Sequence, residues 1–196
     1  MDQDVPELVV MVLAAGGSER LGTPKQLLPI NGTSLLQHAL RECGGLVDSS
    51  LFVVIGAHAA QVAGELQDLD VELVHNANWQ TGIASSVRAG LAALPETADG
   101  VLICLCDQPF VTRDELRALA DLWSGDPNKI VASEYAGTIG VPAVFPSRLF
   151  PELAALKGDS GAKKVIDREV GKVSVPLPAA AVDIDKPEDI MLLSGD

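Results

Sequence analysis

Short apolar runs recur along the chain, and between them lie stretches in which apolar residues return every three or four positions. The runs predict strands and the periodic stretches predict helices. The predicted strands are Leu8–Ala15, Leu51–Ile55, Val71–Val74, Val101–Cys106 and Ile130–Ala132. The predicted helices are Ser34–Glu42, Ala59–Leu66, Ile83–Leu94 and Arg113–Leu122. Such an alternation is typical of an α/β fold with a mostly parallel sheet.

The last third of the chain departs from this alternation. Short extended segments are interrupted there by Gly137, Gly140, Pro142 and Pro146. A helical segment follows at Ser160–Arg168. Because no repeat or linker divides the chain, we predict a single domain over residues 1–196, with a core of about residues 8–193. In this interpretation the later segments complete the opposite wall of a cleft.

A glycine-rich segment, Leu13–Lys25, follows the first predicted strand and is the strongest candidate for a ligand site. Ligands of open α/β sheets bind at the carboxyl ends of the strands. The adjacent Gly16 and Gly17 do not fit the dinucleotide pattern Gly-x-Gly-x-x-Gly. A Walker A loop requires lysine directly after its last glycine, and here threonine and proline separate Gly22 from Lys25.

What remains in this segment is a turn with backbone N–H groups free for an anion, and with Arg20 and Lys25 able to contact that anion. The alternative is an ordinary strand-to-helix loop with two surface cations. The net charge of −13, from 27 acidic and 14 basic residues, opposes binding to nucleic acid or to an anionic membrane. An anionic substrate therefore requires local positive charge or a divalent metal.

Carboxylates form the second candidate feature. Asp107 follows the apolar run Val101–Cys106, at the carboxyl end of a predicted central strand. A carboxylate buried there requires a cation, a metal or several N–H donors. Asp183 and Asp185 alternate along an extended segment, so both face the same side, and one of them would complete a magnesium site with Asp107. The alternative for each acid is a turn or a helix cap.

Amide and hydroxyl side chains lie between two of these features. The segment 76–82 precedes a predicted helix, and Ser85 and Ser86 follow near the start of that helix. Such groups suit a base, a ribose or a phosphate, and capping of the helix is the alternative. Arg88 faces either the cleft or the solvent.

Histidine and cysteine patterns exclude other classes of protein. The histidines have no metal-ligand spacing and no Gly-x-Ser-x-Gly segment, which disfavours a hydrolase triad. Three cysteines, of which Cys104 and Cys106 lie in an apolar run, favour core packing in a reduced, cytoplasmic protein. No apolar run is long enough to span a membrane, and Met1–Glu7 lacks the cations of a secretory signal.

Taken in order, these segments resemble the MobA-like nucleotidyltransferases, and most closely the molybdenum cofactor cytidylyltransferases. The resemblance runs from Leu13 to about Asp189. Its residues are Leu13–Gly16 with Arg20, Gly22 and Lys25; Asn78–Trp79 with Gly82 and Ser85; Cys106–Pro109; Tyr135 with Gly137, Gly140 and Pro142; Gly158–Asp159 with Gly161–Ala162; and Asp183–Asp185 with Pro187–Asp189. It implies a Rossmann-like three-layer sandwich of the nucleotide-diphospho-sugar transferase type.

The resemblance also implies roles for particular residues. The glycine-rich segment would hold a nucleoside triphosphate, with Arg20, Lys25 and Asp107 as catalytic residues. Asp107 would bind Mg²⁺, with Asp185 as the second ligand. The implied nucleotide-binding residues are Leu13, Ala14, Ala15, Gly16, Gly17, Ser18, Arg20, Lys25, Asn78, Gly82, Ser85 and Asp107.

The implied reaction joins CTP to a molybdopterin-type cofactor and releases pyrophosphate, and a molybdenum hydroxylase would receive the product. Leu-Ala-Ala-Gly at residues 13–16 resembles the cytidylyl branch, whereas guanylyl members more often show Leu-Ala-Gly-Gly. One departure is Val141, where many relatives carry histidine before the proline. The alternatives are GTP, a different phosphorylated acceptor, or a non-catalytic molybdenum cofactor carrier or insertion chaperone.

Overall fold

The structure is a computed structural model that describes residues 5–46 and 51–193. The prediction made for Met1–Glu7 therefore lies mostly outside the described residues, as do the two ends of the predicted domain. Within the described ranges, no helix is both long enough and apolar enough to cross a membrane.

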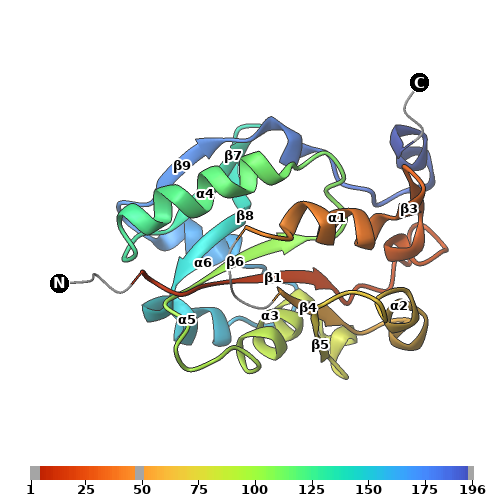
Figure 1. Cartoon of the computed structure of the whole chain (residues 1–196), viewed down its shortest axis with the longest axis horizontal. Coiled ribbons are helices and arrows are strands. Elements are labelled where there is room, and N and C mark those ends of the chain that lie inside the picture. The colour runs from red at the N-terminus through yellow and green to blue at the C-terminus, as the bar shows by residue number, and fades with distance from the viewer. Residues whose placement is uncertain (1–4, 47–50, 194–196) are drawn as a thin grey trace.

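The described chain forms a seven-stranded sheet in the order β5-β4-β1-β6-β8-β7-β9 (Figure 1). Its strands are β1 (Leu8–Ala14), β4 (Leu51–Ile55), β5 (Glu72–His75), β6 (Gly100–Leu105), β7 (Val131–Tyr135), β8 (Thr138–Pro146) and β9 (Val173–Pro176). β8 is antiparallel to both of its neighbours, and the other neighbouring pairs are parallel. The predicted α/β fold with a mostly parallel sheet is confirmed.

Helices cover both faces of the sheet. They are α1 (Leu35–Cys43), α2 (Ala59–Glu65), α3 (Ile83–Leu91), α4 (Arg113–Gly125), α5 (Phe150–Ala154) and α6 (Lys163–Arg168). Buried residues of α1, α2 and α4 pack on one face, and those of α3, α5 and α6 pack on the other. A small hairpin, β2 (Pro29–Ile30) with β3 (Thr33–Ser34), lies before α1. The arrangement is the expected three-layer sandwich.

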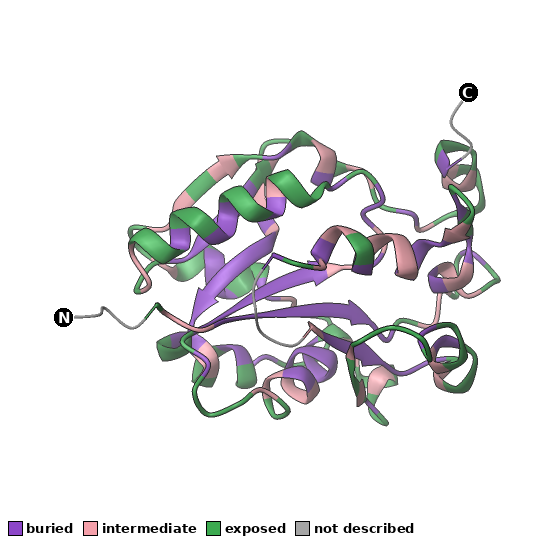
Figure 2. Ribbon diagram, viewed as in Figure 1, coloured by how far each residue is buried: buried purple, intermediate pink, exposed green. Residues whose placement is uncertain are grey.

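The apolar runs form strands because they are buried on both sides. Every residue of β1 is buried (Figure 2). Successive side chains of β1 alternate between the two helix layers. Such a strand has no solvent face, so its sequence is continuously apolar rather than alternating. Helices α1 and α4 begin at side-chain caps: Ser34 with Gln37 and Thr112 with Glu115 both form capping boxes.

Two predicted helices extend three residues too far at one end. Helix α3 ends at Leu91 rather than Leu94, because the chain tightens into a turn before Pro95. The predicted helix at Ser160–Arg168 begins only at Lys163. The sequence did indicate short extended segments after residue 133, and the structure joins two of them, β7 and β8, through a turn at Ala136 and Gly137 with positive φ at both residues.

Helix α3 approaches the sheet closely at Gly90. A Cβ at Gly90 would lie 1.9 Å from Sδ of Met11 and 3.0 Å from a methyl group of Val54. Gly64, on α2, has only the side-chain nitrogen of Gln67 near its Cβ position, at 3.9 Å.

We therefore expect Gly90→Ala to lower the free energy of unfolding by about 1–2 kcal/mol, because overpacking outweighs the gain in helix propensity. Gly64→Ala is the matched control and is expected to raise that free energy by up to about 1 kcal/mol. Urea denaturation of both variants measures the difference. Equal effects at the two positions would contradict the close packing of α3.

Candidate active site

A cavity of about 580 Å³ lies at the carboxyl ends of β1 and β6. After β1 the chain adds β4 and β5 on one side of β1, and it later adds β6 on the other side of β1. This is the switch point at which α/β sheets bind ligands. The cavity is lined by Leu13, Ala14, Ala15, Gly16, Gly17, Glu19, Lys25, Gln26, Trp79, Gln80, Gly82, Ile83, Ser86, Leu105, Cys106, Asp107 and Asp159.

The glycine-rich segment folds back on itself after β1. Ser18 and Gly22 have φ values of 54° and 75°, and the Ser18 carbonyl accepts hydrogen bonds from the N–H groups of Leu21 and Gly22. The Lys25 N–H then donates to Ser18 Oγ at 3.0 Å. A short 3₁₀ turn, Lys25–Leu27, follows Pro24 in place of the helix that a Walker A loop would begin. The Lys25 side chain is thereby directed into the cavity wall.

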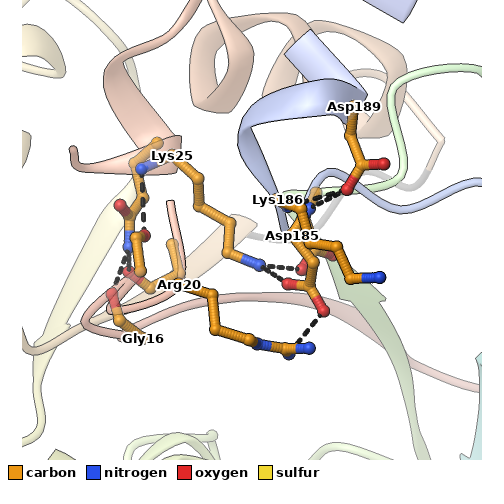
Figure 3. A network of polar contacts seen from close by, with 10 residues as sticks. Gly16, Arg20, Lys25, Asp185, Lys186 and Asp189 are labelled. Atoms are coloured by element: carbon orange, nitrogen blue, oxygen red, sulfur yellow. Dashed lines mark hydrogen bonds and ion pairs between the residues drawn. The ribbon is translucent and has the colours of Figure 1, made fainter. Parts of the chain in front are cut away.

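Lys25 joins two carboxylates from distant parts of the chain (Figure 3). Its Nζ lies 2.7 Å from Asp107 Oδ2 and 2.5 Å from Asp185 Oδ1. Asp107 directly follows Cys106 at the end of β6, and Asp185 precedes the final 3₁₀ turn of the described chain. Arg20 Nη2 contacts the other oxygen of Asp185 at 2.8 Å, from a side chain that is 68% exposed. The structure thus brings together the predicted catalytic and metal-binding residues.

The Lys25 ammonium and the Asp185 carboxylate stabilise each other in their charged forms. Burial lowers the pKa of the Lys25 ammonium, but the neighbouring Asp107 and Asp185 outweigh burial and raise that pKa well above its usual value. Burial raises the pKa of the Asp185 carboxyl, and Lys25 and Arg20 more than offset this effect, so the net pKa is lowered. Burial, together with the charges of Asp107 and Asp185, raises the pKa of Asp183.

Asp107 fits the role of a metal ligand. Its Oδ1 atom is buried and has no hydrogen-bond partner in the described part of the chain. Among residues 5–46 and 51–193, no three His, Cys, Asp or Glu side chains are grouped to hold a metal. A divalent ion at this site would therefore take one or two protein carboxylates, with water and phosphate oxygens as its other ligands. Mg²⁺ is usually bound in this way.

The structure separates the predicted nucleotide-binding residues into two sets. Residues 13–17, Lys25, Gly82 and Asp107 line the cavity. Ser18 and Arg20 do not, and they act instead on Lys25 and Asp185.

Asn78 and Ser85 also lie outside the cavity wall. The Ser85 hydroxyl donates to the carbonyls of Asn78 and Gly82 and accepts from the Asn76 amide, so its hydrogen-bonding capacity is used internally. Ser85 does not cap α3, because the start of that helix has no side-chain cap hydrogen bond. Arg88 Nη1 donates to the Leu156 carbonyl at 2.5 Å, which places its guanidinium between α3 and α5 and away from the cavity.

Two cavity residues, Trp79 and Gln26, had no assigned role in the sequence prediction, whereas Ser86 was a candidate there. Trp79 forms one wall, and it approaches so closely that a Cβ on Gly17 would lie 2.8 Å from its ring. Ser86, next to Ser85, lines the cavity where Ser85 does not. Gln26 is buried beneath the glycine-rich segment. The only sequence signal for Trp79 was its place in the segment that resembles the family.

A loop from the second half of the chain closes the side of the cavity. Gly82 has a φ of 98°, and a Cβ there would lie 2.3 Å from the carbonyl group of Gly158. This close approach brings Asp159 to the cavity, across from the glycine-rich segment. The later segments therefore complete a cavity wall, as the sequence predicted.

Residues 10–173 match the MobA-like NTP transferase domain. The chain therefore belongs to the MobA-like family of nucleotidyltransferases, in agreement with the resemblance seen in its sequence. It is 33% identical to nicotine blue oxidoreductase of Paenarthrobacter nicotinovorans over 83% of this chain and 82% of that protein. It is 30% identical to purine catabolism protein PucB of Bacillus subtilis over 94% of each.

Solved structures support the same fold. The crystal structure of Rv0371c from Mycobacterium tuberculosis has a TM-score of 0.83 and 32% identity, over 97% of this chain and 100% of that one. A second structure of that protein, in complex with manganese, has a TM-score of 0.80 and 28% identity, over 95% of this chain and 97% of that one.

Lys25→Met tests the electrostatic account of the network. We expect it to lower the free energy of unfolding at pH 7 by about 1–3 kcal/mol, because two carboxylates lose their shared cation while retaining some solvent. The pKa of folded Asp185 is lowered from 3.8, so its stabilisation is present above that pH and is lost as the pH falls through the folded value.

The difference in unfolding free energy between the wild type and Lys25→Met should therefore shrink below about pH 5, as urea denaturation at several pH values will measure. Lys163→Met is the control, because Lys163 pairs with the exposed Asp167. It should change the stability by less than about 0.5 kcal/mol. A Lys25→Met difference that does not change with pH would contradict the account.

Proposed function

We propose that this nucleotidyltransferase is a CTP:molybdopterin cytidylyltransferase, which forms the cytosine dinucleotide cofactor and pyrophosphate. The observation that carries the proposal is the contact of Lys25 with both Asp107 and Asp185 beside the glycine-rich segment, with Lys25 and Asp107 in the cavity wall. Cations, carboxylates and free backbone N–H groups are the parts that transfer of a charged phosphoryl group requires.

The glycine-rich segment would bind the triphosphate through its N–H groups. Lys25 has three N–H donors and gives two of them to carboxylates, so one is left for a phosphate oxygen. Arg20 lies at the rim with most of its side chain exposed, where it can meet the pyrophosphate portion. Both cations would offset the charge on the transferring and leaving phosphates.

Mg²⁺ would be held by Asp107, with Asp185 as the second carboxylate, and it would supply further neutralisation of phosphate charge. The unpartnered Oδ1 of Asp107 supports this assignment. The manganese complex of the related Rv0371c protein supports a divalent ion in general.

In the proposed reaction, a terminal phosphate oxygen of the acceptor forms a bond to the α-phosphorus of CTP. The bond from that phosphorus to the bridging oxygen breaks, and pyrophosphate leaves with its electron pair. The nucleophile is already an anion at neutral pH, so this chain needs no general base. Its residues contribute positioning and charge stabilisation.

CTP is preferred in this proposal because residues 13–16 read Leu-Ala-Ala-Gly, as in the cytidylyl branch of the family. Val141 stands where many relatives carry histidine, so the acceptor pocket departs from the family pattern there. A molybdenum hydroxylase would receive the product. The buried, unbridged cysteines of the described chain support a reducing compartment, and we propose the cytoplasm.

A second candidate is an oxidoreductase, because one relative with 33% identity is named nicotine blue oxidoreductase. The segment after β1 lacks the dinucleotide pattern, which favours the transferase. A non-catalytic carrier of the molybdenum cofactor would need neither a nucleotide nor the Lys25 network.

The test is a nucleotide panel with molybdenum cofactor as acceptor and Mg²⁺ present, with pyrophosphate release as the readout. We expect turnover with CTP well above that with GTP. Lys25→Ala and Asp107→Asn should each lower kcat by about 100- to 1,000-fold, because each removes charge stabilisation at the reacting phosphates.

Lys163→Ala and Asp167→Asn are matched controls, since this exposed pair lies outside the cavity wall, and both should keep near-normal turnover. Equal rates with GTP would remove the preference for cytosine. Absence of pyrophosphate with every nucleotide, or oxidation of reduced nicotinamide instead, would contradict the proposal.

A further inference from the structure

Gln26 is a buried polar side chain at the cavity for which the proposed reaction has no use. It directly follows Lys25 and is 1% exposed. Its Nε2 donates to the Ala14 carbonyl at 2.8 Å and to the Gly16 carbonyl at 2.9 Å. One amide group therefore binds the backbone on both sides of Ala15, where β1 passes into the glycine-rich segment.

These two bonds belong to a continuous set in which successive backbone carbonyls accept hydrogen bonds. The Leu13 carbonyl accepts from the Cys106 N–H at 3.3 Å, and the Ala15 carbonyl accepts from the Ala57 N–H at 3.0 Å. With Gln26, all the carbonyls from residue 13 to residue 16 are bonded within the protein. Within residues 5–46 and 51–193, neither the Gly16 nor the Gly17 N–H group makes a hydrogen bond.

The glycine-rich segment consequently offers donors and no free carbonyl acceptors at its start. A backbone with both groups available would repel a phosphate through its carbonyl oxygens as much as it attracted the phosphate through its N–H groups. Gln26 contributes two of the bonds that reduce this repulsion. An apolar side chain of similar size would fill the same space but would leave Ala14 and Gly16 with unpaired carbonyls.

The amide oxygen of Gln26, Oε1, provides a second observation. Its Oε1 atom is buried and has no hydrogen-bond partner in the part of the chain that the structure describes. Buried polar atoms are nearly always paired in folded proteins, so an unpaired one in a cavity wall is expected to serve the site. A side chain present only for packing would not need this acceptor.

We propose that Gln26 is a positioning residue, which holds the Ala14 and Gly16 carbonyls inward so that the glycine-rich segment recognises phosphate. This inference rests on the proposed function, because it takes the phosphates of a nucleoside triphosphate as the ligand. In this proposal Gln26, which does not react, determines selectivity for the polyphosphate and does not determine selectivity for the base.

The test compares binding of inorganic pyrophosphate and of cytidine to the full-length chain by calorimetry, with magnesium chloride present. Gln26→Met keeps the approximate volume and removes both donors. We expect it to weaken pyrophosphate binding about tenfold or more, the equivalent of losing one or two hydrogen bonds, and to leave cytidine binding within about twofold.

Gln37→Met is the matched control. Gln37 Nε2 also donates to a backbone carbonyl, that of Glu65 at 2.8 Å, but Gln37 is not part of the cavity wall. It should leave the binding of both probes unchanged. If Gln26→Met fails to fold, amide NMR of the wild type supplies the measurement, and pyrophosphate should shift the Gly16 and Gly17 N–H resonances.

Each outcome decides the inference. Equal pyrophosphate affinity of Gln26→Met and the wild type, an equal loss of cytidine and pyrophosphate binding, or unshifted Gly16 and Gly17 resonances would overturn it. A wild-type chain that binds pyrophosphate selectively through these residues but makes no product from CTP would overturn the proposed function and leave the role of Gln26 standing.

Discussion

The Lys25 ammonium is shared between two carboxylates that belong to distant segments of the chain. Asp107 follows the end of β6 and Asp185 lies just before the last described turn, and both reach Lys25 within 2.7 Å. Without this cation, two partly buried negative charges would face each other at the cavity. The contact therefore fixes where the glycine-rich segment, the central strand and the end of the described chain meet.

Stability alone gives a weak reason for such a network. Partly buried ion pairs lose much of their attraction to the cost of removing charge from water, and apolar replacements are often as stable. Among the described residues, Lys25 has one donor unused and the neighbouring Asp107 has one oxygen unpaired. Such a pair is suited to exchange partners when a charged ligand enters. The chain has a net charge of −13, so this local arrangement must attract an anion against the field of the whole protein.

Much of the fold followed from local pattern, because strands buried on both faces must be apolar throughout. The glycine-rich segment and Asp107 were also predictable, since strand ends at a switch point are where ligands bind. The contact between Asp185 and Lys25 could not be predicted from local pattern. Alternation placed Asp183 and Asp185 on one face, but only the path of the late segments decided which acid made the contact.

The remaining features depend on tertiary contacts that no local pattern encodes. Ser85 and Ser86 are neighbours with the same chemistry, and the rotation of α3 turns only Ser86 into the cavity. Trp79 reaches the wall because Gly17 lacks a side chain, although the two residues are far apart in sequence. The sequence gives no sign that Gln26 differs from other polar residues. Only the structure shows that its amide donates to the carbonyls of Ala14 and Gly16.

The central claim is that Lys25, Asp107 and Asp185 form the charge-handling part of a metal-assisted nucleotide site. A crystal structure with CTP and Mn²⁺, with the metal located by anomalous scattering, tests it most directly. The account predicts manganese bound to Asp107 and to phosphate oxygens, with Lys25 Nζ in contact with a phosphate. Manganese and nucleotide bound elsewhere, with Lys25 still enclosed by the two carboxylates alone, would contradict it.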